Sequence, residues 1–115
     1  MPRLAVAFVS DLLFASNIEA TLGRAGYEVR TVEDVPAFDR VISHRDASVV
    51  ILDLHAGVGA SEVVSRAKGT PVLAFGRHTE PALLRAAREA GCAEVVPRST
   101  FVEKMLDLVR EMEKA

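Results

Sequence analysis

The chain has 115 residues, of which 50% are apolar and 26% are charged. This length and composition are typical of one folded domain with a buried core, and they argue against a disordered chain. The formal net charge is −2 and Lys and Arg are scattered among acids, which gives no electrostatic reason to expect nucleic acid or an anionic membrane as a partner.

The N-terminal stretch MPRLAVAFVSD holds one Arg and a short apolar run that ends at Ser10 and Asp11. It is too short, and becomes polar too soon, for a signal peptide or a membrane span, so we expect a cytoplasmic protein. The run 4–9 is instead typical of a buried strand. Cys92 is the only cysteine, which excludes an intrachain disulfide and a Cys-rich metal site and fits a reducing compartment.

Along the chain, strand-like apolar runs alternate with stretches of helical periodicity. The expected strands are 4–9, 27–32, 48–54, 70–76 and 93–97. The run 48–54 is the most apolar and is placed in the centre of a sheet, whereas the alternating run 27–32 suits an edge.

Each strand is followed by an expected helix with its own start and stop signals. Asp11 and Asp34 are predicted to cap the first two helices, and Gly26 to end the first. Thr79 is predicted to cap the fourth helix, and Ser99 or Thr100 the fifth. The inner stripe expected for the fifth helix is Val102, Met105, Leu106, Val109 and Met112.

Five strand–helix repeats predict an α/β fold of the flavodoxin-like (βα)5 type, a three-layer sandwich around a parallel sheet in the order 2-1-3-4-5. Ligands of such sheets bind outside the carboxyl ends of the strands. The polar residues and glycine expected at that edge are Ser10, Asp11, Asp53, His55, Gly76, His78, Arg98 and Ser99.

Asp53 ends the central strand and allows two interpretations. It is either a nucleophilic or metal-binding carboxylate, or a polar residue that accepts N–H groups of the loop after the strand. Asp11 could hold Mg²⁺ together with Asp53, but the N-cap role uses its acceptor geometry. Two carboxylates are few ligands for a metal site, and no cofactor is expected.

The remaining polar residues of this edge also have two interpretations. His55 and His78 could bind zinc or relay a proton with an Asp, or they are solvated loop residues. Arg98 could pair with Asp53, bind an anion at the start of the last helix, or lie in solvent.

Together these residues resemble a response-regulator receiver domain, the phosphoacceptor module of two-component signalling. The resemblance covers almost the whole chain, which implies one receiver-like domain over 1–115. The stretch VVILDL resembles the strand that carries the phosphorylated Asp, which implies Asp53 as the phosphoacceptor equivalent. The stretches TPVLAFG and EAGCAEVVPRS resemble the second half of the family, and the spacing from Gly76 to Arg98 matches that between its switch Ser/Thr and its Lys.

The departures from the family affect the chemistry. The acidic pair that holds Mg²⁺ in the family falls on Val9 and Ser10, and only a shift by one residue brings Asp11 into play. Gly76 stands at the switch Ser/Thr, Arg98 at the Lys, and Ser99 at the Pro that follows it. Phosphoryl transfer needs a metal and a fixed cation to neutralise the oxygens of the moving group. The chain is therefore interpreted as a degenerate receiver, or pseudo-receiver, in which Asp53 anchors the loop edge.

The leading hypothesis is a stand-alone signalling protein, not an enzyme, that acts by binding protein partners without conventional Mg²⁺-dependent phosphorylation. One alternative is a working phosphoacceptor of a phosphorelay at Asp53. Another is a small-anion or metabolite binder that uses Asp53, His55, His78 and Arg98.

The family's usual exchange face is the fourth helix, fifth strand and fifth helix. Its charged residues have mixed signs, which suits a two-fold homodimer contact, although a solvated face explains them as well. These residues are Arg85, Arg88, Glu89, Glu94, Glu103, Lys104, Asp107 and Arg110.

Overall fold

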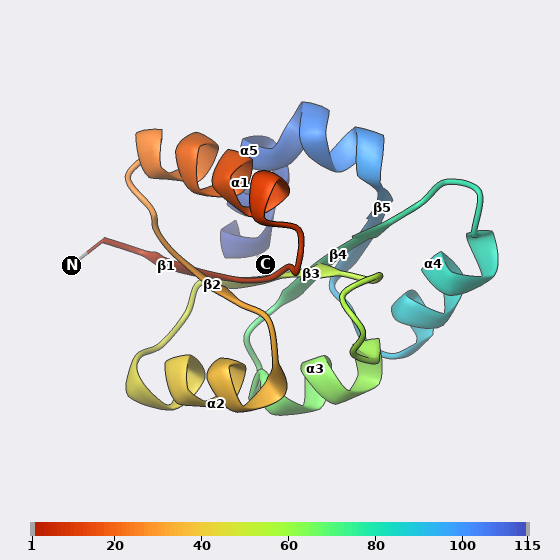
Figure 1. Cartoon of the computed structure of the whole chain (residues 1–115), viewed down its shortest axis with the longest axis horizontal. Coiled ribbons are helices and arrows are strands. Elements are labelled where there is room, and N and C mark those ends of the chain that lie inside the picture. Colours follow the sequence, from red (N-terminus) through yellow and green to blue (C-terminus); the bar gives the residue numbers. More distant parts are fainter. Residues whose placement is uncertain (1, 115) are drawn as a thin grey trace.

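The computed structural model describes residues 2–114, which alternate strictly between strand and helix (Figure 1). The expected boundaries agree with the observed ones to within a few residues at most. The elements are β1 Leu4–Phe8, α1 Leu12–Arg24, β2 Glu28–Val32, α2 Val35–His44, β3 Val49–Asp53, α3 Ala60–Arg66, β4 Val72–Gly76, α4 Pro81–Glu89, β5 Glu94–Pro97 and α5 Arg98–Lys114.

All five strands pair in parallel in the order β2-β1-β3-β4-β5, which confirms the predicted flavodoxin-like topology. The apolar β3 is central and fully buried, and the alternating β2 lies at an edge. Because the order reverses direction after β1, the carboxyl ends of β1 and β3 meet next to each other.

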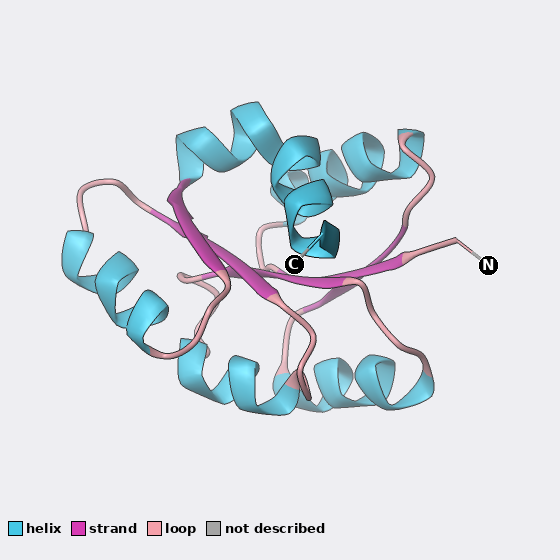
Figure 2. Ribbon diagram, turned by 180° about the vertical axis from the view of Figure 1, so that it is seen from behind, coloured by secondary structure: helices cyan, strands magenta, loops and turns pink. Residues whose placement is uncertain are grey.

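Helices cover both faces of the sheet and make two separate cores (Figures 1 and 2). On one face, α1 and α5 pack on a cluster that includes Ile18, Ile51 and Val109. On the other face, α2, α3 and α4 pack on a cluster that includes Phe38 and Leu52. Alternate residues of each strand enter opposite cores, as the period of a strand requires.

Three phenylalanines join α1 and α5 to the sheet near the carboxyl edge. Phe75 of β4 stacks on Phe101 of α5 with ring centroids 4.6 Å apart, and Phe14 of α1 lies 5.1 Å from Phe75. Aromatic pairs at these separations add to the stability that burial alone supplies. This cluster fixes where α1 and α5 begin.

Three predictions about helix ends and faces were wrong. Thr79 does not cap α4, because Glu80 occupies the cap position and no side chain bonds the first turn. Ser99 and Thr100 do not cap α5, because the helix begins at Arg98 directly after β5. Val102, which was expected in the core, is 56% exposed, and Phe101 is buried there in its place. The helix is kinked at Lys104, which rotates the two parts of its apolar stripe against each other.

Within residues 2–114, none of the helices combines the length and apolarity that a membrane crossing needs.

Candidate functional site

Asp53 is the one charged side chain that the described part of the chain buries, with 6% of its surface exposed. It ends β3 beside Phe75 of β4. Its Oδ1 accepts the backbone N–H of His55 at 2.9 Å, and its carbonyl accepts the N–H of Ala56 at 3.0 Å. The carboxylate thus closes the first turn of the loop that follows β3.

Asp11 performs the capping role that its position predicts. Its backbone is extended, and Oδ1 accepts the N–H groups of Leu13 and Phe14 at 3.0 and 3.1 Å. These bonds satisfy two of the four free N–H groups at the start of α1. One oxygen of this carboxylate is therefore already committed to its own helix.

Arg98 does not pair with Asp53, which corrects one of the interpretations of the sequence. Its Nη2 lies 3.8 Å from Oδ2 of Asp11, and its Cζ lies 4.2 Å from the ring centroid of Phe14. The guanidinium thus stacks on an aromatic face and faces a partly exposed carboxylate. Both contacts link the N-terminal ends of α1 and α5, and both draw the cation toward α1.

His55 joins the loop after β3 to the loop after β4. Its Nε2 accepts the N–H of Arg77 at 3.3 Å and lies 3.5 Å from Oε2 of Glu80. Arg77 also reaches the same Glu80 oxygen at 3.4 Å. The sequence alone does not point to Arg77 or Glu80, because nothing in the spacing relates Arg77 to a histidine 22 residues earlier, or Glu80 to the same histidine.

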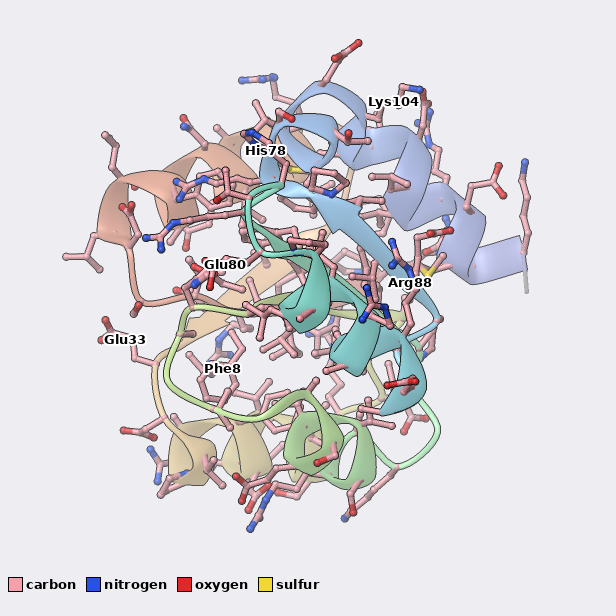
Figure 3. The ribbon with its side chains drawn as sticks, turned by 90° about the vertical axis from the view of Figure 1, so that its right-hand side faces the viewer. Phe8, Glu33, His78, Glu80, Arg88 and Lys104 are labelled. Atoms are coloured by element: carbon pink, nitrogen blue, oxygen red, sulfur yellow. The ribbon has the colours of Figure 1, made fainter. Side chains whose placement is uncertain are left out.

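The other predicted edge residues lie where the topology requires. Ser10, His78 and Ser99 are exposed at the carboxyl edge of the sheet. Figure 3 shows His78 and Glu80 on the segment between β4 and α4. The side chain of His55 contacts Arg77 and Glu80, and that of Arg98 contacts Asp11 and Phe14, so neither side chain pairs with Asp53.

Gly76, at the end of β4, is closely covered by two leucines. A Cβ at this position would lie 3.2 Å from Cδ2 of Leu84 and 3.3 Å from Cδ1 of Leu54. Leu54 comes from the loop directly after Asp53, and Leu84 from α4. The space beside Gly76 is therefore filled by apolar side chains, and a larger residue there must displace them.

This edge of the sheet offers few ligands for a divalent metal ion. Within residues 2–114, no group of three or more His, Cys, Asp or Glu side chains is arranged to hold a metal. Val9, one of the two positions that correspond to the acidic pair, is buried in the core beneath α1 with 1% of its surface exposed. Mg²⁺ is held by carboxylates, waters and phosphate oxygens, and here Asp53 is the one buried carboxylate available.

Solved structures with a similar fold include response regulators and receiver domains. CheY4 of Vibrio cholerae, a chemotaxis response regulator, matches with a TM-score of 0.80 and 21% identity over 97% of this chain and 99% of its own. A response regulator from Thermotoga maritima matches with a TM-score of 0.84 and 11% identity over 100% of both chains. The chain has the receiver fold.

A third receiver domain, that of the sensor histidine kinase PA1611 from Pseudomonas aeruginosa, was solved with a magnesium ion coordinated in its active-site cleft. It matches with a TM-score of 0.82 and 14% identity over 100% of both chains. No family model matches the sequence, and no curated protein matches it either. The similarity therefore lies in the fold, and the function has to be argued from the residues at the site.

Proposed function

We propose that this protein is a receiver-like signalling protein that acts by binding protein partners, without conventional Mg²⁺-dependent phosphorylation of Asp53. The observation that carries the proposal is the surroundings of Gly76. In the receiver family the corresponding position is a switch Ser or Thr, whereas here it has no side chain and Leu54 and Leu84 fill the adjacent space. A phosphoryl group on Asp53 would have no hydroxyl beside it to draw inward.

The electrostatics of the edge support the same proposal. A phosphoryl group brings negative charge to a site, and transfer requires cations that neutralise it. The position of the family's Lys is Arg98, whose guanidinium is held over Phe14 and near Asp11. The position of the acidic pair includes the buried Val9, so the metal ligands are reduced to Asp53 and a helix-capping Asp11.

The protein is proposed to be a binding module and not an enzyme. A hydrolytic or transfer reaction needs a nucleophile, a base and an oxyanion donor within reach of one reacting atom. At this edge Asp53 is bonded to the N–H of its own loop, and His55 is bonded to the next loop. These contacts join loops and do not converge on a space for a substrate.

A homodimer through α4, β5 and α5 remains part of the proposal. The charged side chains of this face have mixed signs, and Figure 3 shows Arg88 and Lys104 on it. Arg88 donates to the carbonyl of Val95 at 3.2 Å, so this side chain is already bonded within its own subunit. Light scattering that gives a strict monomer at high protein concentration would remove the homodimer from the proposal.

One observation favours a second candidate, a working phosphoacceptor. Asp53 stands at the end of the central strand, and one of its carboxylate oxygens accepts the N–H of His55 while the other has no described hydrogen bond within residues 2–114. The receiver domain of PA1611 holds magnesium in its active-site cleft. In this candidate Asp53 and Asp11 would hold Mg²⁺, and Asp53 would accept the phosphoryl group.

Beryllofluoride, which mimics an acyl phosphate, separates the two candidates. The amide NMR spectrum of the full chain with millimolar Mg²⁺ should not change when beryllofluoride is added, because the site lacks the metal ligands and the switch side chain. The Asp53→Asn variant serves as the control. Saturable shifts that spread from Asp53 to Gly76 and Arg98, and that vanish in Asp53→Asn, would contradict the proposal and establish the phosphoacceptor.

A further inference from the structure

A groove of about 460 Å³ lies beside the edge strand β2, on the face of the sheet that α2 covers. Its apolar floor includes Leu4, Val32 and Val41, and its rim carries Arg30 and Arg40. β2 is an edge strand of the sheet, and Figure 1 shows α2 below it. The groove lies between an edge strand and a helix, and β1 separates this edge strand from β3, which carries Asp53.

The backbone of β2 has unpaired groups along this groove. The N–H of Glu28 donates to the carbonyl of Arg3, and the carbonyl of Val32 accepts the N–H of Val9. The backbone N–H and carbonyl groups of residues 28, 30 and 32 therefore point toward β1. In a parallel ladder the alternate residues face the other way. The N–H and carbonyl groups of Val29 and Thr31 therefore point outward from the sheet. They offer two donors and two acceptors at the spacing that an added strand requires.

The charge of the groove is opposite to that of the whole chain. Its lining includes three arginines and His44, but a single acid, Glu28. Glu28 is already bonded to Arg45 at 2.6 Å, and Arg45 also donates to the carbonyl of Pro2 at 2.8 Å. Arg30 makes a long ion pair with Glu28 at 4.0 Å and is exposed, and Arg40 is also exposed. Both guanidinium groups can therefore face an incoming group, in a chain whose net charge is −2.

We propose that this groove binds an extended acidic segment of a partner protein, which adds to β2 as a sixth strand. Main-chain bonds to Val29 and Thr31 supply part of the affinity, and side chains of the added strand that face α2 enter the groove. Because side chains alternate along a strand, Asp or Glu at every second position would face Arg30 and Arg40. The proposal does not depend on whether Asp53 is phosphorylated.

A simpler explanation of the positive charges of Arg30 and Arg40 is that they keep the edge strand from aggregating. Arg30 alone would serve that purpose. It does not account for a groove with an apolar floor, nor for a second exposed arginine on the helix across from the strand. The combination of outward backbone groups, apolar floor and paired cations is what an extended acidic peptide recognises.

A titration of the ¹⁵N-labelled full chain with a synthetic heptapeptide tests the proposal. The peptide carries Glu at alternate positions and Thr or Val between them. Saturable shifts are expected at the amides of Val29 and Thr31, together with slower hydrogen exchange of these two N–H groups. Thr31→Pro removes an outward N–H and leaves the ladder to β1 intact, and it should weaken binding roughly tenfold.

Charge reversal gives a second, independent variant. Arg40→Glu should weaken binding roughly tenfold, because it replaces a cation of the groove with an anion. Arg24→Glu is the matched control: it makes the same charge change on an exposed residue of α1, which covers the other face of the sheet, and it should leave binding unchanged. Far-UV circular dichroism confirms that each variant is folded before it is titrated.

Four outcomes would overturn the proposal. The first is an unchanged spectrum at millimolar heptapeptide, and the second is equally tight binding of a version of the peptide with Gln in place of Glu. Inorganic phosphate that shifts the amide of Val29, and does so in Thr31→Pro as well, would identify a small-anion site. Broadening at β2 that grows with protein concentration alone would show that a second copy of the chain occupies the edge.

Discussion

Gly76 is the residue at which the identity of a single side chain has the largest effect on the proposed function. Its backbone ends β4 and is buried between Leu54 and Leu84. The contacts that a Cβ would make, at 3.2 and 3.3 Å, are shorter than most carbon–carbon contacts in a packed interior. The two leucines can pack in these positions because residue 76 has no side chain.

Restoring a switch residue should therefore be costly. Gly76→Thr adds three heavy atoms where both neighbours are already in contact, and overpacking of this kind lowers the free energy of unfolding by about 1–3 kcal/mol. The loss should be smaller in a Leu54→Ala background, which makes room for the threonine, and urea denaturation of the single and double variants measures this coupling. Equal losses in both backgrounds would show that Leu54 does not control the space beside residue 76.

Arg98 shows how a residue's partner is decided by its surroundings. The sequence allowed a pair with Asp53, a bound anion or exposure to solvent, whereas in the structure Arg98 contacts Phe14 and Asp11. Phe14 is fixed by the aromatic cluster with Phe75 and Phe101, so its ring presents a face at the start of α5. An arginine at that point gains cation–π contact without losing access to water.

At the scale of the elements, helix starts differ in whether a side chain closes them. Oδ1 of Asp34 accepts the N–H of Ala37 at 2.8 Å, and Asp11 closes α1 in the same way. Thr79, which the sequence favoured equally, is exposed and stands one residue before the cap position of α4. Glu80, at that cap position, directs its carboxylate to His55 and Arg77.

Alanine variants should separate these starts. Asp34→Ala removes a cap bond and should lower the free energy of unfolding by about 1 kcal/mol. Thr79→Ala removes an exposed side chain that caps nothing, and the change should stay within about 0.5 kcal/mol. Chemical denaturation of both variants provides the measurement. A loss at Thr79 as large as that at Asp34 would show that threonine caps α4 in solution.

At the scale of the whole molecule, one ion pair joins three distant segments. Arg45, after α2, bonds Glu28 at the start of β2 and the carbonyl of Pro2 before β1. The hydrogen bond from Arg45 holds the pKa of Glu28 below its ordinary value of 4.5, and the positive charges of Arg45 and Arg30 act in the same direction. Burial opposes this effect to a smaller extent.

The sign of the pH dependence follows from that direction. A carboxylate with a lowered pKa in the folded state stabilises the protein above its unfolded pKa, and this contribution is lost as the pH falls through the folded value. Thermal melts between pH 5 and pH 3 should therefore show a steeper fall in Tm for the native chain than for Glu28→Gln. Glu19→Gln, which changes an exposed carboxylate of α1, is the control and should follow the native slope.

The sequence by itself determined the alternation of elements, the order of the strands and the edge at which Asp53 and Asp11 stand. It could do so because strand and helix periods are local and because parallel crossovers allow few arrangements. It also placed Asp11, Asp34 and Gly26 at the ends of helices, since cap geometry depends on residues within one turn.

Tertiary packing alone decided what surrounds those residues. Phe101 enters the core in place of Val102, Arg98 contacts Phe14, and His55 contacts Glu80. Each of these contacts depends on how segments far apart in the chain meet. The leucines beside Gly76 and the groove beside β2 arise in the same way. A side chain's contacts are set by the shape that all neighbours leave to it, and that shape exists only once the helices have packed on the sheet.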